Sequence, residues 1–144
     1  MEKIKLEFEV KGAFKAKQSV KFTRNGMRYT PKEVVAYSNW VRNSFIMTYP
    51  EHKPEDLAGY YLKIGIIVYF KIPESFSKKK RELALADDIR PDKKPDWDNI
   101  SKNICDALNG IAYPDDKAIV DGRVSKYYAE SESVFIEIKG FKYE

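Results

Sequence analysis

The chain has 144 residues, of which 43% are hydrophobic and 14% aromatic, and this composition fits one globular domain over residues 1–144 rather than a disordered chain. A single cysteine excludes an intrachain disulfide, and the single histidine, His52, disfavours both a zinc site and a Ser-His-Asp triad. Lys and Arg outnumber Asp and Glu by 26 to 22, so the net charge of +4 favours polyanionic partners only weakly.

The first third of the chain passes from a strand pattern through a basic segment to a helix pattern. Every second side chain of residues 3–10 is apolar, which predicts a strand with one solvent-exposed face. Residues 11–32 hold seven basic residues and no acid, and a turn is predicted at 24–27. The segment 30–33 is a capping box with proline at the first helical position, so a helix is expected to follow and to stop before Pro50.

Two unlike segments come next. Residues 61–72 form an apolar and aromatic run, which predicts a central strand that is buried over most of its length. The charged segment 75–94 is expected to be a mobile loop with a short helix near 82–87. The basic run 78–81 within it indicates either a solvated loop or a flexible clamp for phosphate.

The last part of the chain predicts one helix and two strands. The helix is expected at 99–109, capped by Asp98 and ended by Gly110. Strand patterns follow at 118–128 and 133–139. The order of elements predicts an α+β fold, in which two main helices pack on a small mixed or antiparallel sheet.

Two aspartates, Asp96 and Asp98, precede the second predicted helix. Pro95 favours an extended backbone for the residue before it, and if Asp96 to Asp98 is also extended, both carboxylates lie on one face and can hold one hard cation. Trp97 between them is then expected to face the core. Lys102 lies one helical turn after Asp98, on the polar side of the helix. Alternatively, Asp98 only caps the helix and Lys102 is an ordinary solvated residue.

A second acidic pair, Asp115 and Asp116, follows a turn at Pro114. The intervening helix and turn can fold back and bring one of these carboxylates to Asp96 and Asp98. Three clustered carboxylates repel one another unless a cation neutralises them, and a site made of oxygen ligands selects Mg²⁺ or Mn²⁺ over zinc. Such an ion activates water, and a nearby lysine stabilises negative charge, as phosphodiester hydrolysis requires. Alternatively, the second pair only forms a turn.

The remaining patterns limit the partners of the protein. The basic segment 11–32 interleaves cations with aromatic side chains, which indicates a nucleic-acid surface or, alternatively, an ordinary solvent-exposed face. No apolar run of about 18 residues predicts a transmembrane helix, and residues 1–5 lack the apolar stretch of a signal peptide. We therefore expect a cytoplasmic protein with no membrane partner. Cys105 and His52 are interpreted as structural or incidental.

Three blocks of the sequence form a pattern with a specific resemblance. Residues 94–102 read K-P-D-W-D-N-I-S-K, residues 106–110 read D-A-L-N-G, and residues 115–120 read D-D-K-A-I-V. In order and spacing these blocks resemble the RusA family of Holliday junction resolvases. A looser likeness extends to the basic amino-terminal segment and to the Y-T-P sequence at 29–31. Trp97 departs from the pattern, since an aliphatic residue is usual there.

The resemblance implies a RusA-like fold and a function. Members of that family are small, dimeric, Mg²⁺-dependent endonucleases of bacteria and their prophages that resolve four-way DNA junctions by symmetric nicks in recombination and repair. The resemblance implies that Asp96, Asp98 and Asp116 bind the metal and that Lys102 is the essential lysine.

We therefore expect Mg²⁺, with Mn²⁺ as a substitute, as the cofactor and no nucleotide cofactor. The expected partners are branched DNA and a second copy of the chain, which forms a homodimer. The basic residues expected to contact the DNA backbone are Lys17, Lys21, Arg24, Arg28, Lys93, Lys94 and Lys126. The alternative is a non-catalytic prophage module that recognises branched or duplex DNA and whose acids are structural.

Overall fold

The computed structural model describes residues 1–15, 21–22, 28–29 and 32–143, and it describes side chains in 1–15 and 36–143. Its elements, in chain order, are β1 (Glu2–Lys11), β2 (Lys21–Phe22), β3 (Arg28–Tyr29), α1 (Lys32–Thr48), a 3₁₀ turn (Pro54–Leu57), β4 (Tyr61–Lys71), α2 (Lys78–Leu85), α3 (Trp97–Leu108), a second 3₁₀ turn (Asp116–Ala118), β5 (Ile119–Ala129) and β6 (Ser133–Lys142). The turn predicted at 24–27 and the first two residues of the predicted capping box lie outside the described residues.

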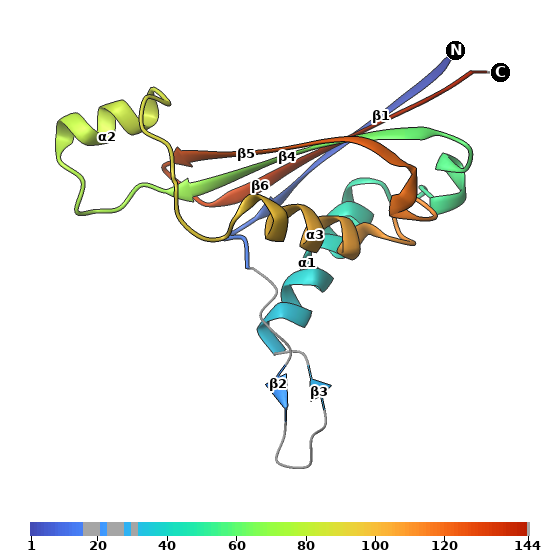
Figure 1. Ribbon diagram of the computed structural model, residues 1–144, viewed down its shortest axis with the longest axis horizontal. Helices are drawn as coiled ribbons and strands as arrows, with labels where there is room; N and C mark the ends of the chain where they lie inside the picture. The colour runs from blue at the N-terminus through green and yellow to red at the C-terminus, as the bar shows by residue number, and fades with distance from the viewer. Residues whose placement is uncertain (16–20, 23–27, 30–31, 144) are drawn as a thin grey trace.

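The centre of the fold is a four-stranded mixed sheet with the strand order β1-β6-β4-β5. β4 and β5 are parallel, whereas β6 is antiparallel to both β1 and β4. Figure 1 shows both termini at one end of this sheet and α2 at the other. The predicted α+β fold is therefore confirmed, and of the two kinds of sheet that the sequence left open the structure has the mixed one.

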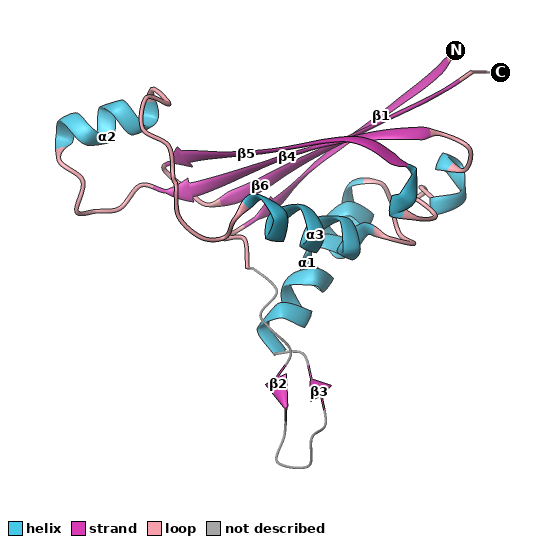
Figure 2. Cartoon of the chain, in the orientation of Figure 1, coloured by secondary structure: helices cyan, strands magenta, loops and turns pink. Residues whose placement is uncertain are grey.

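Helices α1 and α3 cover one face of the sheet, and none of the helices in the described residues covers the other face (Figure 2). The core lies between this face and the two helices, where apolar side chains from the strands meet Phe45 of α1 and Ile104 of α3. α3 buries one stripe, made of Ile100, Asn103, Ile104, Ala107 and Leu108. Because apolar residues at this spacing share one side of a helix, the opposite side of α3 is turned to solvent.

The position of β4 agrees with the prediction, but its burial does not. β4 lies between β6 and β5, as expected for a central strand. Only alternate residues are buried, among them Leu62, Ile64 and Ile66, while the residues between them are exposed or half-buried. The reason is that the helices cover a single face, so half of this apolar run lies on the uncovered face.

The charged segment predicted as a mobile loop contains a helix four residues earlier than expected. α2 begins at Lys78 because Ser77 caps it, its hydroxyl oxygen accepting a hydrogen bond from the Lys80 N–H at 3.1 Å. Ala84 of this helix is fully buried. Within the part of the chain that the structure describes, no helix is both long and apolar enough to cross a membrane.

Candidate active site

The amino end of α3 is built around Asp96. Its Oδ1 accepts a hydrogen bond from the Asn99 N–H at 3.0 Å, so Asp96 is the N-cap and the helix begins at Trp97. The prediction that Asp98 caps this helix was therefore wrong, since Asp98 lies in the first turn. A carboxylate can accept about four hydrogen bonds, so this cap uses only part of the acceptor capacity of Asp96.

The predicted burial of Trp97 was also wrong, because 59% of this side chain is exposed. The prediction assumed an extended chain, in which successive side chains point to opposite faces. Only Asp96 has an extended backbone, and from Trp97 onward each residue turns by about 100° around the helix axis. The indole therefore lies in solvent between the two aspartates of the motif.

The solvent-facing side of α3 carries a row of charged residues at every fourth position. The row consists of Asp98, Lys102 and Asp106, and all three are exposed. Successive members are about 6 Å apart along the helix axis, given a rise of about 1.5 Å per residue. The row therefore places Lys102 between two acidic residues on the exposed side of one helix, as the sequence predicted for Asp98 and Lys102.

The carboxyl end of α3 fixes Asp116. The Asn109 side chain fixes the backbone of Asp116, because its Oδ1 accepts a hydrogen bond from the Asp116 N–H at 3.1 Å. The turn between them is held by Tyr113, which is fully buried and donates its hydroxyl to the Cys105 carbonyl oxygen at 2.9 Å. Asp115 caps the 3₁₀ turn that follows, accepting a hydrogen bond from the Lys117 N–H at 3.1 Å.

Three carboxylates act on one another at this end of the helix. Partial burial raises the pKa of Asp116, and the neighbouring Asp115 and Asp106 raise it further. The pKa of Asp115 is lowered, chiefly because its carboxylate accepts the hydrogen bond from the Lys117 backbone. A carboxylate that is surrounded by others in this way is stabilised by a proton or by a cation.

The predicted metal ligands thus occupy the two ends of α3. Asp96 and Asp98 lie at its amino end, and Asp116 lies beside its carboxyl end. Among the described residues, no three Asp, Glu, His or Cys side chains come close enough together to hold one metal ion. The convergence of Asp96, Asp98 and Asp116 on a metal therefore stays a prediction.

The sequence-based interpretation did not assign roles to two residues that the structure places at this site. Asp106 contributes to the raised pKa of Asp116, and Asn109 holds the Asp116 backbone. Both lie in the D-A-L-N-G block. The four-residue spacing from Asp98 through Lys102 to Asp106 is the signal that indicates the first of them, because such residues share one side of a helix.

The basic residues predicted to bind DNA have different positions. Lys93 and Lys94 are exposed and directly precede the motif, and a hollow of about 260 Å³ is lined by Lys94, Pro95, Asp96 and Asn99. Lys17 and Arg24 lie outside the described residues. Lys21 lies in β2 and Arg28 in β3, which pair with each other, and their side chains are not described.

Lys126 makes contacts within the protein rather than projecting freely. Its ammonium group donates hydrogen bonds to the carbonyl oxygen of Pro95 at 3.0 Å and to that of Lys93. These bonds tie β5 to the two residues that flank Lys94, just before the helix cap. The structure thus gives Lys126 a positioning contact, and its contact with DNA stays a prediction.

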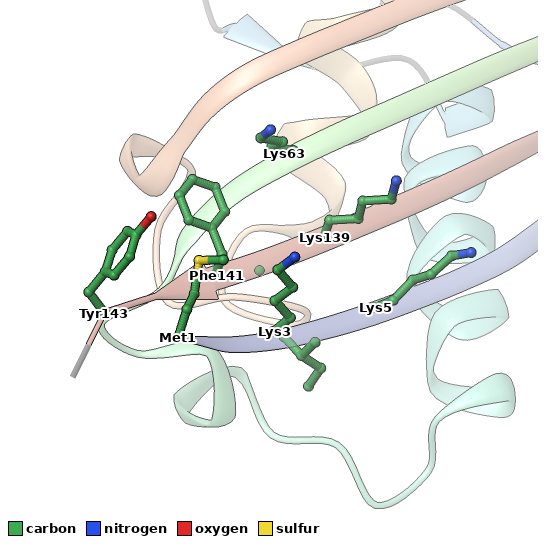
Figure 3. Close-up of a pocket in the computed structure, with 9 residues that line it drawn as sticks. Met1, Lys3, Lys5, Lys63, Lys139, Phe141 and Tyr143 are labelled. Atoms are coloured by element: carbon green, nitrogen blue, oxygen red, sulfur yellow. The ribbon is translucent and has the colours of Figure 1, made fainter.

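A wider hollow lies on the uncovered face of the sheet, away from α3. It has a volume of about 630 Å³ and lies between the ends of β1, β4 and β6. Figure 3 shows Lys3, Lys5, Lys63 and Lys139 around it, together with aromatic side chains near the termini. Among the described residues that line it there is no carboxylate, the kind of ligand that a divalent cation prefers.

His52 and Cys105 have the structural roles that were expected of them. The Nε2 atom of His52 lies 2.8 Å from the Ala112 carbonyl oxygen, and its ring packs edge-on against Phe45. Burial raises the pKa of the Cys105 thiol to about 11. A thiol with so high a pKa is a poor nucleophile at neutral pH, which argues against Cys105 as a nucleophile.

Comparison with known proteins agrees with the resemblance of the three blocks. Residues 11–139 match the model of a family described as endodeoxyribonuclease RusA. The chain is also similar to the uncharacterized protein YqaN of Bacillus subtilis (strain 168), with 37% identity over 106 residues, which cover 72% of this chain and 75% of that protein. The family match spans the whole of α3 and of the strands β4 and β5. The chain therefore belongs to the RusA endodeoxyribonuclease family.

Proposed function

We propose that this protein is a Mg²⁺-dependent endonuclease that resolves four-way DNA junctions. The observation that carries the proposal is the exposed row of Asp98, Lys102 and Asp106 on α3, which begins two residues after the cap Asp96. It stands in a chain that belongs to a family of endodeoxyribonucleases. Cleavage of DNA requires negative charge to be neutralised at a phosphate, and a lysine beside carboxylates supplies one cation for this purpose.

Asp96, Asp98 and Asp116 would hold the metal ion. Their donors are carboxylate oxygens only, which fits Mg²⁺ or Mn²⁺. The raised pKa of Asp116, caused partly by Asp115 and Asp106, supports the fit because a bound cation relieves that repulsion. When bound, the ion supplies an activated water and positive charge at the phosphate.

Lys102 and the amino end of α3 would orient the substrate. Lys102 follows Asp98 by one helical turn on the exposed side of α3, so its ammonium group would contact a phosphate that is bound at these acids. Lys93 and Lys94, which are exposed next to Asp96, would bind the neighbouring backbone. Two symmetric nicks across a junction need two such sites, and a dimer with twofold symmetry provides them.

Cleavage of a labelled four-way junction in Mg²⁺ tests this function. We expect paired nicks from the unmodified protein and a loss of at least about 1000-fold for Asp98→Asn, because removal of one ligand weakens the charge stabilisation that the metal supplies. Asp98→Asn is expected to bind the junction at least as tightly as the unmodified protein, because one negative charge near phosphate is removed.

The matched control is Asp121→Asn, which changes an exposed aspartate on β5 outside the motif. This control is expected to cut at the normal rate. Normal cleavage by Asp98→Asn would contradict the metal assignment. Binding of the junction by the unmodified protein without cleavage, in either Mg²⁺ or Mn²⁺, would show a DNA-binding module instead of a nuclease.

A further inference from the structure

The segment between β4 and α3 forms an arm, residues 73–91, that extends past the end of the sheet. Figure 1 shows α2 of this arm beyond the carboxyl ends of the parallel strands β4 and β5, at the opposite end of the sheet from both termini. The arm then returns to Asp96 at the amino end of α3. It therefore connects a projecting helix directly to the candidate active site.

Contacts with the last residues of β5 and the turn that follows brace the outgoing half of the arm. Phe76 packs edge-on against Tyr128, with 5.5 Å between the ring centroids. Arg81 forms an ion pair with Glu130, at 3.6 Å between Nη2 and Oε1. Ala84 is fully buried. These contacts hold α2 in one position relative to the sheet.

The returning half of the arm is tied to the same strand. The guanidinium group of Arg90 lies 3.7 Å above the ring of Tyr127, and its Nε donates a hydrogen bond to the Lys126 carbonyl oxygen at 2.7 Å. Lys126 in turn donates to the carbonyl oxygen of Pro95. The chain between α2 and Asp96 is thus anchored to β5 at Arg90 and at Pro95. The position of α2 is therefore coupled to that of Asp96.

The positive charge on α2 is concentrated at its amino end. The helix begins with the four cations of residues 78–81, and its first turn contains no acid. Lys78, Lys79 and Lys80 are exposed, and of the four cations only Arg81 forms an ion pair within the described residues. Cations at the amino end of a helix oppose its dipole, so this arrangement does not serve the stability of α2.

We propose that the arm binds the sugar-phosphate backbone of DNA, with Lys78 and Lys79 contacting phosphates outside the one that is cut. This inference rests on the proposed function. Successive residues of a helix point about 100° apart, so the exposed lysines present cations on several sides of α2 and bind phosphate without reading base sequence. Because contacts with β5 already hold the arm in place, binding of DNA would order few additional groups and lose little affinity to that cost.

The salt dependence of junction binding tests the arm. Affinity for a labelled four-way junction is measured in Ca²⁺, over a range of salt concentrations, for the full chain and for Lys78→Ala/Lys79→Ala. Alanine is a good helix former at exposed positions, so α2 is expected to remain folded, which circular dichroism checks. We expect affinity to fall roughly 10- to 50-fold at about 0.1 M salt, and the slope of log affinity against log salt to flatten by about 1.8, or about 0.9 per lost phosphate contact.

The matched control is Lys3→Ala/Lys63→Ala, which removes two exposed lysines from the uncovered face of the sheet. It changes the net charge by the same amount and is expected to leave the slope unchanged. An unchanged slope for the arm variant, or equal losses in both variants, would overturn the inference while the unmodified protein still binds and cuts. Failure of the unmodified protein to bind the junction would instead overturn the proposed function.

Discussion

At its amino end, α3 is capped by the side chain of Asp96, and the chain before this cap is tied to β5 by Lys126. At its carboxyl end, Asp116 is held through its backbone N–H by Asn109, and the buried Tyr113 holds the turn between them. The first acid thus stabilises the helix with its own carboxylate, whereas the second is held at its backbone N–H by a side chain of the helix end. Substitutions can therefore test each end of α3 separately. At either end, one can replace the acid itself or the residue that positions it.

The largest expected effect comes from removing one acid at each end. Asp98→Asn and Asp116→Asn are each expected to lower single-turnover cleavage by about 1000-fold or more, if both act on one metal site. The double variant is then expected to lose little further activity, because groups that act as a unit are not additive. Multiplied losses in the double variant, or normal cleavage by Asp116→Asn, would show that the two ends do not form one site.

The next largest effect concerns the helix that joins the two ends. Ile104 is fully buried, so Ile104→Ala is expected to lower the free energy of unfolding by about 2–5 kcal/mol, measured by urea denaturation. Lys102→Ala on the exposed side is expected to change stability by less than about 0.5 kcal/mol and to abolish cleavage. A stable Ile104→Ala variant would contradict the position of α3 over the core.

The smallest effect tests how the amino end is held. Lys126→Met keeps the side chain's length but loses its hydrogen bonds to Pro95 and Lys93, so we expect a loss of about 1 kcal/mol in unfolding free energy. We also expect weaker Mn²⁺ binding, measured by calorimetry. Lys126→Arg is expected to restore both, because a guanidinium group can donate to two carbonyl oxygens. Equal Mn²⁺ affinity in the unmodified protein and both variants would show that Lys126 stabilises the fold without positioning the metal ligands.

Local patterns predicted most elements of this fold because each depends on neighbouring residues. Alternation in residues 3–10 and the proline at position 50 placed β1 and the end of α1 correctly. The sequence placed the start of α3 at residue 99, two residues later than the observed start at Trp97. Asp96 and Asp98 are both good N-caps, and only the backbone geometry decides between them. The half-burial of β4 depends on which face the helices cover, and a single strand's sequence does not contain that information.

The sequence predicted the acids and the lysine of the candidate site, but not the contacts that position them. The spacing of Asp98 and Lys102 correctly placed both on the solvent side of α3. The contacts of Lys126 with Pro95 and of Asn109 with Asp116 join segments that are separate along the chain, and they arise only when β5 and α3 pack. Such tertiary contacts carry no local pattern, which is why the role of Asn109 was missed.

The parallel pairing of β4 and β5 has an evolutionary consequence. Two adjacent parallel strands must be joined by a crossover, and here that single connection, residues 72–118, contains α2, the aspartates, Lys102 and the turn at Tyr113. The strands on either side form a frame, and the residues proposed for metal binding and catalysis all lie in this one continuous segment. Exchange of the segment between relatives would transfer the proposed site as a unit and leave the frame unchanged.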